Sequence, residues 1–401
     1  MSFALDGQDI DPNSQDGQKR LALAHRRGAR PICRCRVSAT QMYIAHQAGR
    51  FLIKRMPGTG AKHAPDCTSF EPPAELSGLG QVKGCAIEEN AEDGTTVLKL
   101  DFALGKSSGR KAPPPPSDGT PTEVTATPKK LTLTSLLHYL WHEADLDKWV
   151  PAMDGKRWWG VVQRALLAGA EAKITKGFPL ASRLFIPEPY HPDRKTDLAA
   201  KPRRAFAAIA NSTKSGTPYG VLIAEYKDFD STRLGAKFRF KHLPDCPFFA
   251  DEDFLKKFNK VFDAQLALAD MVQDAHIITI ATFSIAKAGY PVLSEMGMML
   301  VTDNWIPFEH LNDLDLIVAM KEGKRSFIKS LRYNLPPSTP IASMVATDLR
   351  QPVSMFVRGP GDSGEAVSQM VTAAEDGAYP AWLWIDDGAM PELPREPRSH
   401  E

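Results

Sequence analysis

Four residues near the start of the chain constrain its fold more than any other feature. Cys33 and Cys35 form a C-x-C pair, and His63 and Cys67 form an H-x-x-x-C pair after 27 intervening residues. Zinc in proteins prefers four tetrahedral nitrogen or sulfur ligands, and a closed set of three cysteines and one histidine leaves no position for water. We therefore expect these four side chains to hold a structural zinc ion.

The segment between the two ligand pairs has the pattern of a β-hairpin. Strand-like runs at 42–46 and 50–54 flank a turn at 47–49. An antiparallel pair returns the chain close to where it left, which would bring the two ligand pairs together. Cys85 and His46 stay open as alternative ligands.

Charged neighbours of the ligands bear on the chemistry of the site. Arg34, Arg36 and Lys62 adjoin the cysteines and the histidine in the sequence. Positive charge next to a thiol favours the thiolate, which is the form that binds metal. We expect these three side chains to assist zinc binding.

The use of cysteine and the hydropathy of the chain indicate a reducing compartment. Three of the five cysteines fall between Cys33 and Cys67, which is unlike a disulfide framework, and Cys246 reads as a buried small hydrophobe. No apolar run approaches the length of a membrane span, and the polar, acidic start lacks the order of a secretory signal. These features predict a cytoplasmic protein without membrane contact.

Basic residues are concentrated around the expected zinc site. Between Lys19 and Lys62 there are eleven Lys or Arg and no acidic residue, although the formal net charge of the whole chain is only +1. Lys and Arg on a small rigid module can neutralise phosphates, so the stretch favours contact with DNA or RNA, while a solvated face that docks an acidic protein is the alternative. The candidate nucleic-acid-binding residues are Arg26, Arg27, Arg30, Arg34, Arg36, Arg50, Lys54, Arg55 and Lys62.

Composition divides the chain into parts. The run Pro113–Pro116 stands in a stretch with almost no apolar residues, which favours an extended linker and two separable halves. After it, helical patterns near 133–146, 156–176, 251–272, 309–321 and 364–376 alternate with short strand-like runs. We expect an α+β or α/β multidomain protein. Its parts would be a disordered tail at 1–18, a basic zinc-binding β-hairpin module at 19–104, a Pro-rich linker at 105–130, a helical segment at 131–178, and a mixed α/β body at 179–401 with two possible subdomains, 179–308 and 309–401.

Two further groups of side chains suggest chemistry. Glu225 and Lys227 end an apolar strand and would share one face, which with Asp193 or Asp197 resembles the metal-binding half of a PD-(D/E)xK nuclease. Such a site would use Mg²⁺ to activate water. His138 and His142 lie four apart on a predicted helix, but the apolar arc of that helix places both toward solvent, so they are not expected to bind metal.

Several segments together resemble a known bacterial family. They include CRC, RFLIKRMPGTGAKHAPDC, SRLFIPEPY and KHLPDCPFF. The chain resembles, over most of its length, the domain of unknown function family numbered 1173, whose N-terminal cysteines match Cys33, Cys35 and Cys67. The resemblance implies no established activity and no catalytic residue. It implies a setting in integrating or conjugating mobile elements, with DNA and other mobile-element proteins as partners.

These observations predict an uncharacterised zinc-binding protein that acts as a nucleic-acid-associated accessory factor of such an element. The pattern favours no enzymatic activity. Two alternatives stay open, namely a Mg²⁺-dependent PD-(D/E)xK-like nuclease and a protein adaptor without enzymatic activity.

Overall fold

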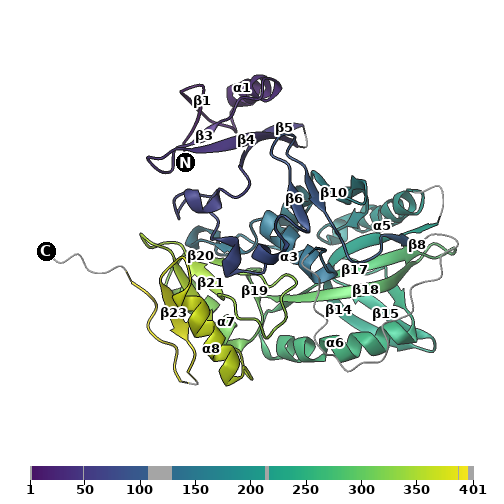
Figure 1. Cartoon of the computed structure of the whole chain (residues 1–401). Helices are drawn as coiled ribbons and strands as arrows, with labels where there is room; N and C mark the ends of the chain where they lie inside the picture. The colour runs from purple at the N-terminus through teal and green to yellow at the C-terminus, as the bar shows by residue number, and fades with distance from the viewer. Residues whose placement is uncertain (1, 48, 107–128, 213–215, 387, 396–401) are drawn as a thin grey trace.

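A small N-terminal lobe stands on a larger body in which helices and sheets are mixed (Figure 1). The computed structural model describes residues 2–47, 49–106, 129–212, 216–386 and 388–395. The mixed α/β architecture expected from the sequence is confirmed. Most of the expected linker at 105–130, including its four prolines, lies outside the described residues, and none of the described helices is both long enough and apolar enough to cross a membrane.

The N-terminal lobe is a five-stranded sheet with one helix, α1 (Gln15–Arg26), packed on it. The expected hairpin is confirmed, since its two long strands pair from Met42 opposite Arg55 to Gln47 opposite Arg50. The strand order is β2-β1-β3-β4-β5, with bounds β1 (Phe3–Leu5), β2 (Gln8–Ile10), β3 (Ile32–Cys33), β4 (Thr40–Gln47) and β5 (Arg50–Arg55).

Residues 1–18 were expected to form a disordered tail, and this expectation is wrong for the described residues. They form β1, β2 and the start of α1, which the Ser14 hydroxyl caps by accepting from the N–H of Gly17 at 2.9 Å. The segment is polar overall, but Leu5 and Ile10 are buried against Leu21 of the helix. A few well-placed apolar side chains are enough to order a short strand pair when a sheet edge and a helix are available to cover them.

The stretch that joins the lobe to the body does not belong to the lobe. After the short helix α2 (Leu79–Val82), strands β6 (Ile87–Glu89) and β7 (Thr96–Leu98) enter a four-stranded sheet of order β11-β10-β7-β6 with β10 (Lys173–Thr175) and β11 (Phe178–Pro179). Leu98, Leu100 and Phe102 lie in one core with residues of the body. The boundary expected at residue 104 therefore cuts through a shared hydrophobic core.

Two helices of the expected helical segment pack together under this sheet. They are α3 (Leu133–Glu143), capped by the Thr132 hydroxyl, and α4 (Trp159–Ala170). The second helix is shorter than the predicted span 156–176. It stops because the chain turns at Ala172, which has a φ of 57°, and then enters strand β10.

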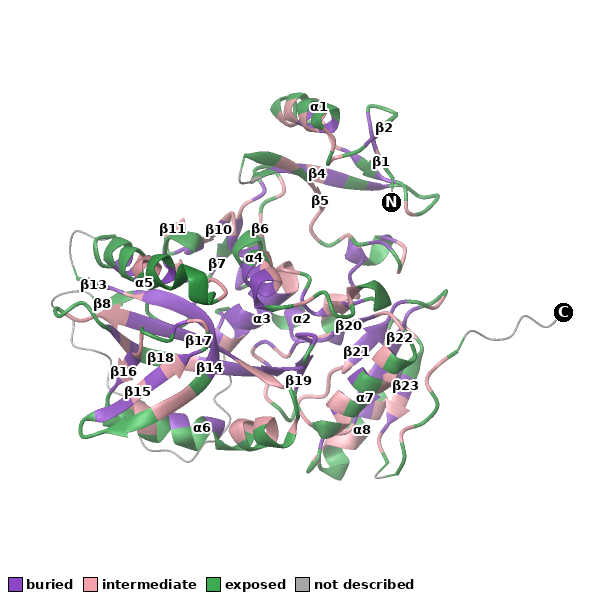
Figure 2. Cartoon of the chain, turned by 180° about the vertical axis from the view of Figure 1, so that it is seen from behind, coloured by how far each residue is buried: buried purple, intermediate pink, exposed green. Residues whose placement is uncertain are grey.

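The largest sheet closes into a small barrel. Strands β14 (Gly220–Thr232), β15 (Gly235–Phe240), β16 (Phe248–Ala250), β18 (Pro291–Val301) and β17 (His276–Ile285) pair in that order, and β17 pairs back with β14. Strands β12 (Leu184–Phe185) and β19 (Pro307–Phe308) pair at its margins. Figure 2 shows the buried residues along β14, β17 and β18, with α5 (Lys195–Ala210) and α6 (Glu252–Met271) outside the sheet.

A second five-stranded sheet makes the C-terminal part of the body. Its order is β23-β22-β21-β20-β9, built from β9 (Lys148–Trp149), β20 (Phe327–Lys329), β21 (Met344–Ala346), β22 (Val353–Val357) and β23 (Ala381–Trp384). Helices α7 (Leu311–Glu322) and α8 (Gly364–Glu375) accompany it (Figure 1). Because β9 comes from the helical segment, that segment contributes to this sheet as well as to the central core.

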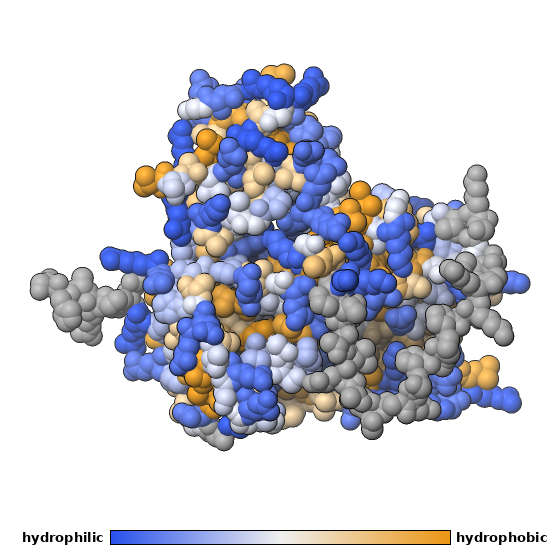
Figure 3. All heavy atoms as spheres, in the orientation of Figure 1, coloured by the Kyte–Doolittle hydropathy of each residue, from blue (hydrophilic) through white to orange (hydrophobic). Residues whose placement is uncertain are grey.

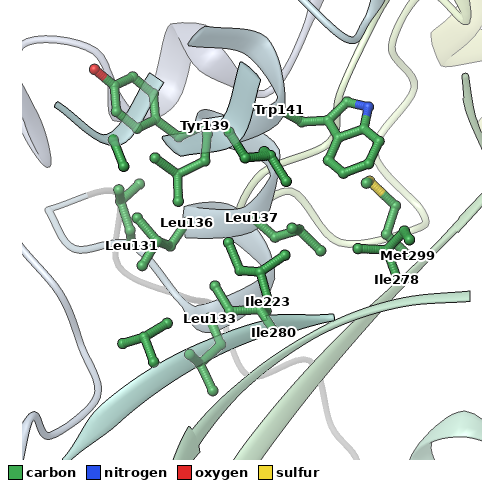
Figure 4. Packing of buried hydrophobic residues seen from close by; sticks show 14 of the residues in the cluster. Leu131, Leu133, Leu136, Leu137, Tyr139, Trp141, Ile223, Ile278, Ile280 and Met299 are labelled. Carbon is green, nitrogen blue, oxygen red and sulfur yellow. The ribbon is translucent and has the colours of Figure 1, made fainter. Parts of the chain in front are cut away.

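Helix α3 lies at the centre of the body and is covered on nearly all sides. Leu136, Leu137 and Trp141 are fully buried and meet Ile278 and Ile280 of the barrel (Figure 4). The expectation that His138 and His142 face solvent is therefore wrong. An amphipathic pattern predicts that the polar side of a helix faces solvent only when other elements cover just its apolar face. In α3 other elements cover both faces.

Candidate metal centre

The four predicted ligands come together in one group. Cys33 ends β3, Cys35 follows it, and His63 and Cys67 lie in the turns after β5, next to the short 3₁₀ helix Gly60–Lys62. Their ligand atoms all lie within 4.8 Å of one another, and this is the single such group of His, Cys, Asp or Glu that the described residues contain. The hairpin β4–β5 brings the two pairs together, as the sequence predicts.

The separations in this group fit a tetrahedral zinc site. Metal–sulfur and metal–nitrogen bonds of about 2.3 and 2.1 Å imply roughly 3.8 Å between two sulfurs and 3.6 Å between sulfur and nitrogen. Cys33 Sγ lies 3.8 Å from Cys67 Sγ, and the Nδ1 of His63 lies 3.4 Å from Cys35 Sγ and 3.7 Å from Cys67 Sγ. The residues therefore fit zinc, with Nδ1 as the histidine ligand atom.

Three of the four side chains are buried, and the fourth, Cys35, is partly exposed. Cys33 and His63 are 1% and 0% exposed, and Cys67 is 6% exposed. Burial raises the pKa of the Cys33 thiol to about 12 and also raises the pKa of Cys67, while burial lowers the pKa of His63. Burial is the largest cause of both cysteine shifts, and the expected effect of Arg34, Arg36 and Lys62 on the thiols does not set these pKa values. A bound cation is the partner that would offset the burial of thiolates here.

The alternative ligands lie elsewhere. Cys85 is exposed after α2, and His46 is exposed on β4, where its ring packs on Phe51 with centroids 4.5 Å apart. Neither belongs to the group of ligand atoms. Cys246 is half-buried and packs against the barrel core, which agrees with its expected role as a small hydrophobe.

The basic surface is smaller than the sequence predicts, because residues before the basic stretch fold back onto it. Asp6 pairs with Arg27, and Asp9 pairs with Arg34 at 2.7 Å. Arg30 donates to the backbone carbonyl of Ala91 at 3.0 Å. The tail expected to be disordered thus neutralises part of the charge.

Two more of the nine candidates point toward the body rather than toward solvent. Arg55 pairs with the buried Glu71, and Lys54 is half-buried, with its pKa lowered first by burial and then by Lys173. The remaining four, Arg26, Arg36, Arg50 and Lys62, are exposed, and within the described residues none of them pairs with a carboxylate. Figure 3 shows hydrophilic side chains spread over this lobe.

The residues of the nuclease alternative are not assembled into a metal site. Glu225 is buried, and its Oε1 lies 2.6 Å from the Nδ1 of His276 and 2.5 Å from the Nζ of Lys241. Lys227 is exposed at the bulge where β14 shifts register against β15. Asp193 stands in an exposed 3₁₀ turn beside His191, and Asp197 pairs with Arg194 at 2.9 Å. None of the three acids joins a group of metal-ligating side chains in the described structure.

A buried polar network that sequence reasoning missed joins the metal centre to the body. His142 on α3 lies with Nε2 3.2 Å from Glu71 and with Nδ1 2.7 Å from Asp147, and Glu71 also pairs with Arg55 at the end of β5. Two carboxylates raise the pKa of His142 to about 10 despite its burial. The one signal available was the position of Glu71, four residues after the ligand Cys67. Nothing in the sequence linked it to His142.

Residues 3–387 match the family model described as Protein of unknown function (DUF1173). No curated protein and no solved structure matches the chain.

Proposed function

The chain belongs to the DUF1173 family, and we propose that it is a zinc-binding protein. In this proposal the zinc ion stabilises the N-terminal lobe, and the lobe contacts nucleic acid. The observation that carries the proposal is the closed group of Cys33, Cys35, His63 and Cys67. With four protein ligands and no open position, the zinc is structural, so it would hold the lobe together and supply no reaction.

The size of the lobe explains why it needs a metal. The cluster between its sheet and α1 has five buried members, Leu5, Ile10, Leu21, Ala24 and Ile44. Small cores of this kind rarely supply enough stability alone and are commonly completed by a metal or disulfides. Zinc would join β3 to the turns after β5, and it would hold Phe70 and Cys67 against Ile328 of the body.

The proposed nucleic-acid contacts are the four exposed basic side chains that pair with no carboxylate in the described part of the chain. Arg36 and Lys62 flank the ligands, so the metal would fix their backbone positions, while Arg26 ends α1 and Arg50 begins β5. Phosphate contact by such residues gives affinity without sequence choice and depends steeply on salt. Phe51 is not a free stacking surface, because its ring contacts His25 and His46.

Metal analysis and a binding titration test the proposal together. Untagged protein should contain one zinc per chain, and zinc well below that ratio would refute the metal assignment. Anisotropy titrations with a labelled duplex and a labelled single strand between 50 and 200 mM salt should show binding that weakens steeply with salt. Each lost phosphate contact lowers the salt slope on duplex by roughly 0.9, so replacing all four residues by Gln should lower it by about 3.6.

A matched control separates this surface from charge in general. Lys260→Gln removes an exposed charge from α6 and should leave the slope unchanged. If the fourfold variant binds as the parent does, the nucleic-acid proposal is wrong for this surface, and the lobe would instead serve as a protein-docking element. A role in integrating or conjugating mobile elements is proposed from the resemblance alone, and the test is whether such elements encode the family.

A further inference from the structure

A cavity far from the metal centre carries a separate inference, independent of the proposed zinc and nucleic-acid roles. It has a volume of about 630 Å³ and lies where β18 of the barrel meets the C-terminal sheet, with walls from α3, α6, α8, the cap residue His310 before α7 and the loop at 332–341. Small-molecule sites commonly measure roughly 300–1,000 Å³ and often occur at such junctions. The cavity is therefore of the right size and in a usual place for a small organic ligand.

Two histidines in its wall present hydrogen-bond donors. The Nδ1 of His138 accepts from the backbone N–H of Tyr333 at 3.0 Å, and the Nδ1 of His310 accepts from the backbone N–H of Asp313 at 3.1 Å. A neutral imidazole that accepts at one nitrogen carries its proton on the other. Both side chains line the cavity, and the hydrogen bonds that these two rings make within the described residues are at Nδ1.

His138 is the stronger indication of a ligand. Its side chain is buried, at 8% exposure, and burial lowers its pKa to about 4, so the ring is neutral at physiological pH. The proton on Nε2 is then available to a hydrogen-bond acceptor of a ligand in the cavity that His138 lines. The tautomer also argues against a metal, because a metal ligand must offer an unprotonated nitrogen.

The charges around the cavity limit the ligand. Arg332 is held against Glu309 at 2.8 Å, and its Nη1 donates to the carbonyls of Pro336 and Thr339 on the loop that forms one wall. Its positive charge is thus already balanced, and Asp362 adds a further carboxylate to the lining. These charges disfavour a polyphosphate or another multiply charged anion.

The rest of the lining is largely apolar. Met298, Leu300 and Phe308 from the barrel face Val357 and Met370 from the C-terminal sheet and α8. We infer that the cavity binds a small organic molecule with an apolar body and one oxygen-acceptor head, carrying at most one negative charge, which accepts from the Nε2–H groups of His138 and His310.

Calorimetry on the full chain tests this inference with three probes, namely octanoate, octanamide and inorganic phosphate. Octanoate or octanamide should bind, and the tighter of the two shows whether the head is charged, while phosphate should not bind. His310→Asn keeps an acceptor for the start of α7, since Asn is a good N-cap, but removes the Nε2–H. It should weaken binding about two- to tenfold, the range of one hydrogen bond.

Two more variants keep the test independent of folding. Ala366→Trp on α8 places a large side chain in the cavity and should abolish binding, while Ser14→Asn exchanges the cap of α1 in the distant lobe and should not change it. Each variant is checked by its thermal transition. No binding by either organic probe, tighter binding of phosphate, or unchanged binding in a folded Ala366→Trp variant would each overturn the inference.

Discussion

Removing residues 1–104 should unfold the body. The removed segment contributes seven large apolar side chains to the central core, each at most 8% exposed, namely Leu79, Val82, Ile87, Leu98, Leu100, Phe102 and Leu104. At about 1.5–3 kcal/mol for each buried side chain, their loss removes roughly 10–20 kcal/mol, which is an upper estimate because the unfolded chain already buries some surface. Domains are typically stable by only about 5–15 kcal/mol. The remaining chain should therefore lack a cooperative fold.

Circular dichroism and thermal melts of a fragment covering residues 105–401 measure this effect. The control is the full chain with a protease site inserted after Ser117, cut after folding, so that both pieces are present. The cut pieces should elute together and melt cooperatively, whereas the lone fragment should be insoluble or lack a thermal transition. A soluble fragment with a native near-ultraviolet spectrum and a cooperative melt would refute the reasoning and restore the two separable halves expected from the linker.

Three point variants test the metal centre and the buried charges. Cys33→Ser should reduce zinc below one per chain and lower the melting temperature of the lobe, because metal-binding energy at such sites is folding energy, while Cys85→Ser should change neither. His142→Gln should cost about 3–5 kcal/mol in urea melts at pH 7, because it leaves Glu71 and Asp147 without their shared partner. Because the pKa of His142 is raised to about 10, the stability that its charged form contributes is complete below about pH 6.5 and is lost as pH rises through about 10. The free energies of unfolding of parent and variant should therefore converge between these pH values. A difference that stays constant over this range would contradict the charged state assigned to His142. Burial raises the pKa of Glu225, but His276 and Lys241 outweigh burial and lower the pKa overall. The ionised carboxylate therefore contributes fully to stability above about pH 4.5, its ordinary pKa, and this contribution is lost as the pH falls through the lowered pKa. Glu225→Gln should therefore destabilise the protein by about 1–3 kcal/mol at pH 7 and much less near pH 3, whereas Mg²⁺-dependent DNA cleavage lost in this variant would favour the nuclease alternative.

Local patterns in the sequence were enough for the metal centre and for most helices. The spacing of Cys33, Cys35, His63 and Cys67, with a hairpin pattern between the pairs, predicted a group whose ligand atoms do lie within 4.8 Å. The spans predicted for α6 and α8 agree with the structure to within one residue at each end, because their apolar periodicity and capping residues are local signals. Short-range geometry of this kind depends little on the rest of the fold.

Local sequence patterns could not predict contacts between segments that are far apart in the chain. Asp6 and Asp9 reach Arg27 and Arg34 only because the N-terminal strands fold back, and no local rule predicts that pairing. The bulge at Lys227 likewise depends on the register of β14 against β15. The basic surface and the nuclease alternative both looked stronger in the sequence for this reason.

The sequence by itself determined which residues form the candidate metal centre, the hairpin that joins them and the mixture of helices and strands, because each depends on residues close together in the chain. Tertiary structure alone decided that α3 is covered on both faces, which buries His138 in a cavity wall and places His142 between Glu71 and Asp147. It also decided that residues 79–104 share the core of the body across a proline-rich stretch. Composition can show where a chain is unable to pack, but which apolar faces cover one another depends on the whole three-dimensional arrangement.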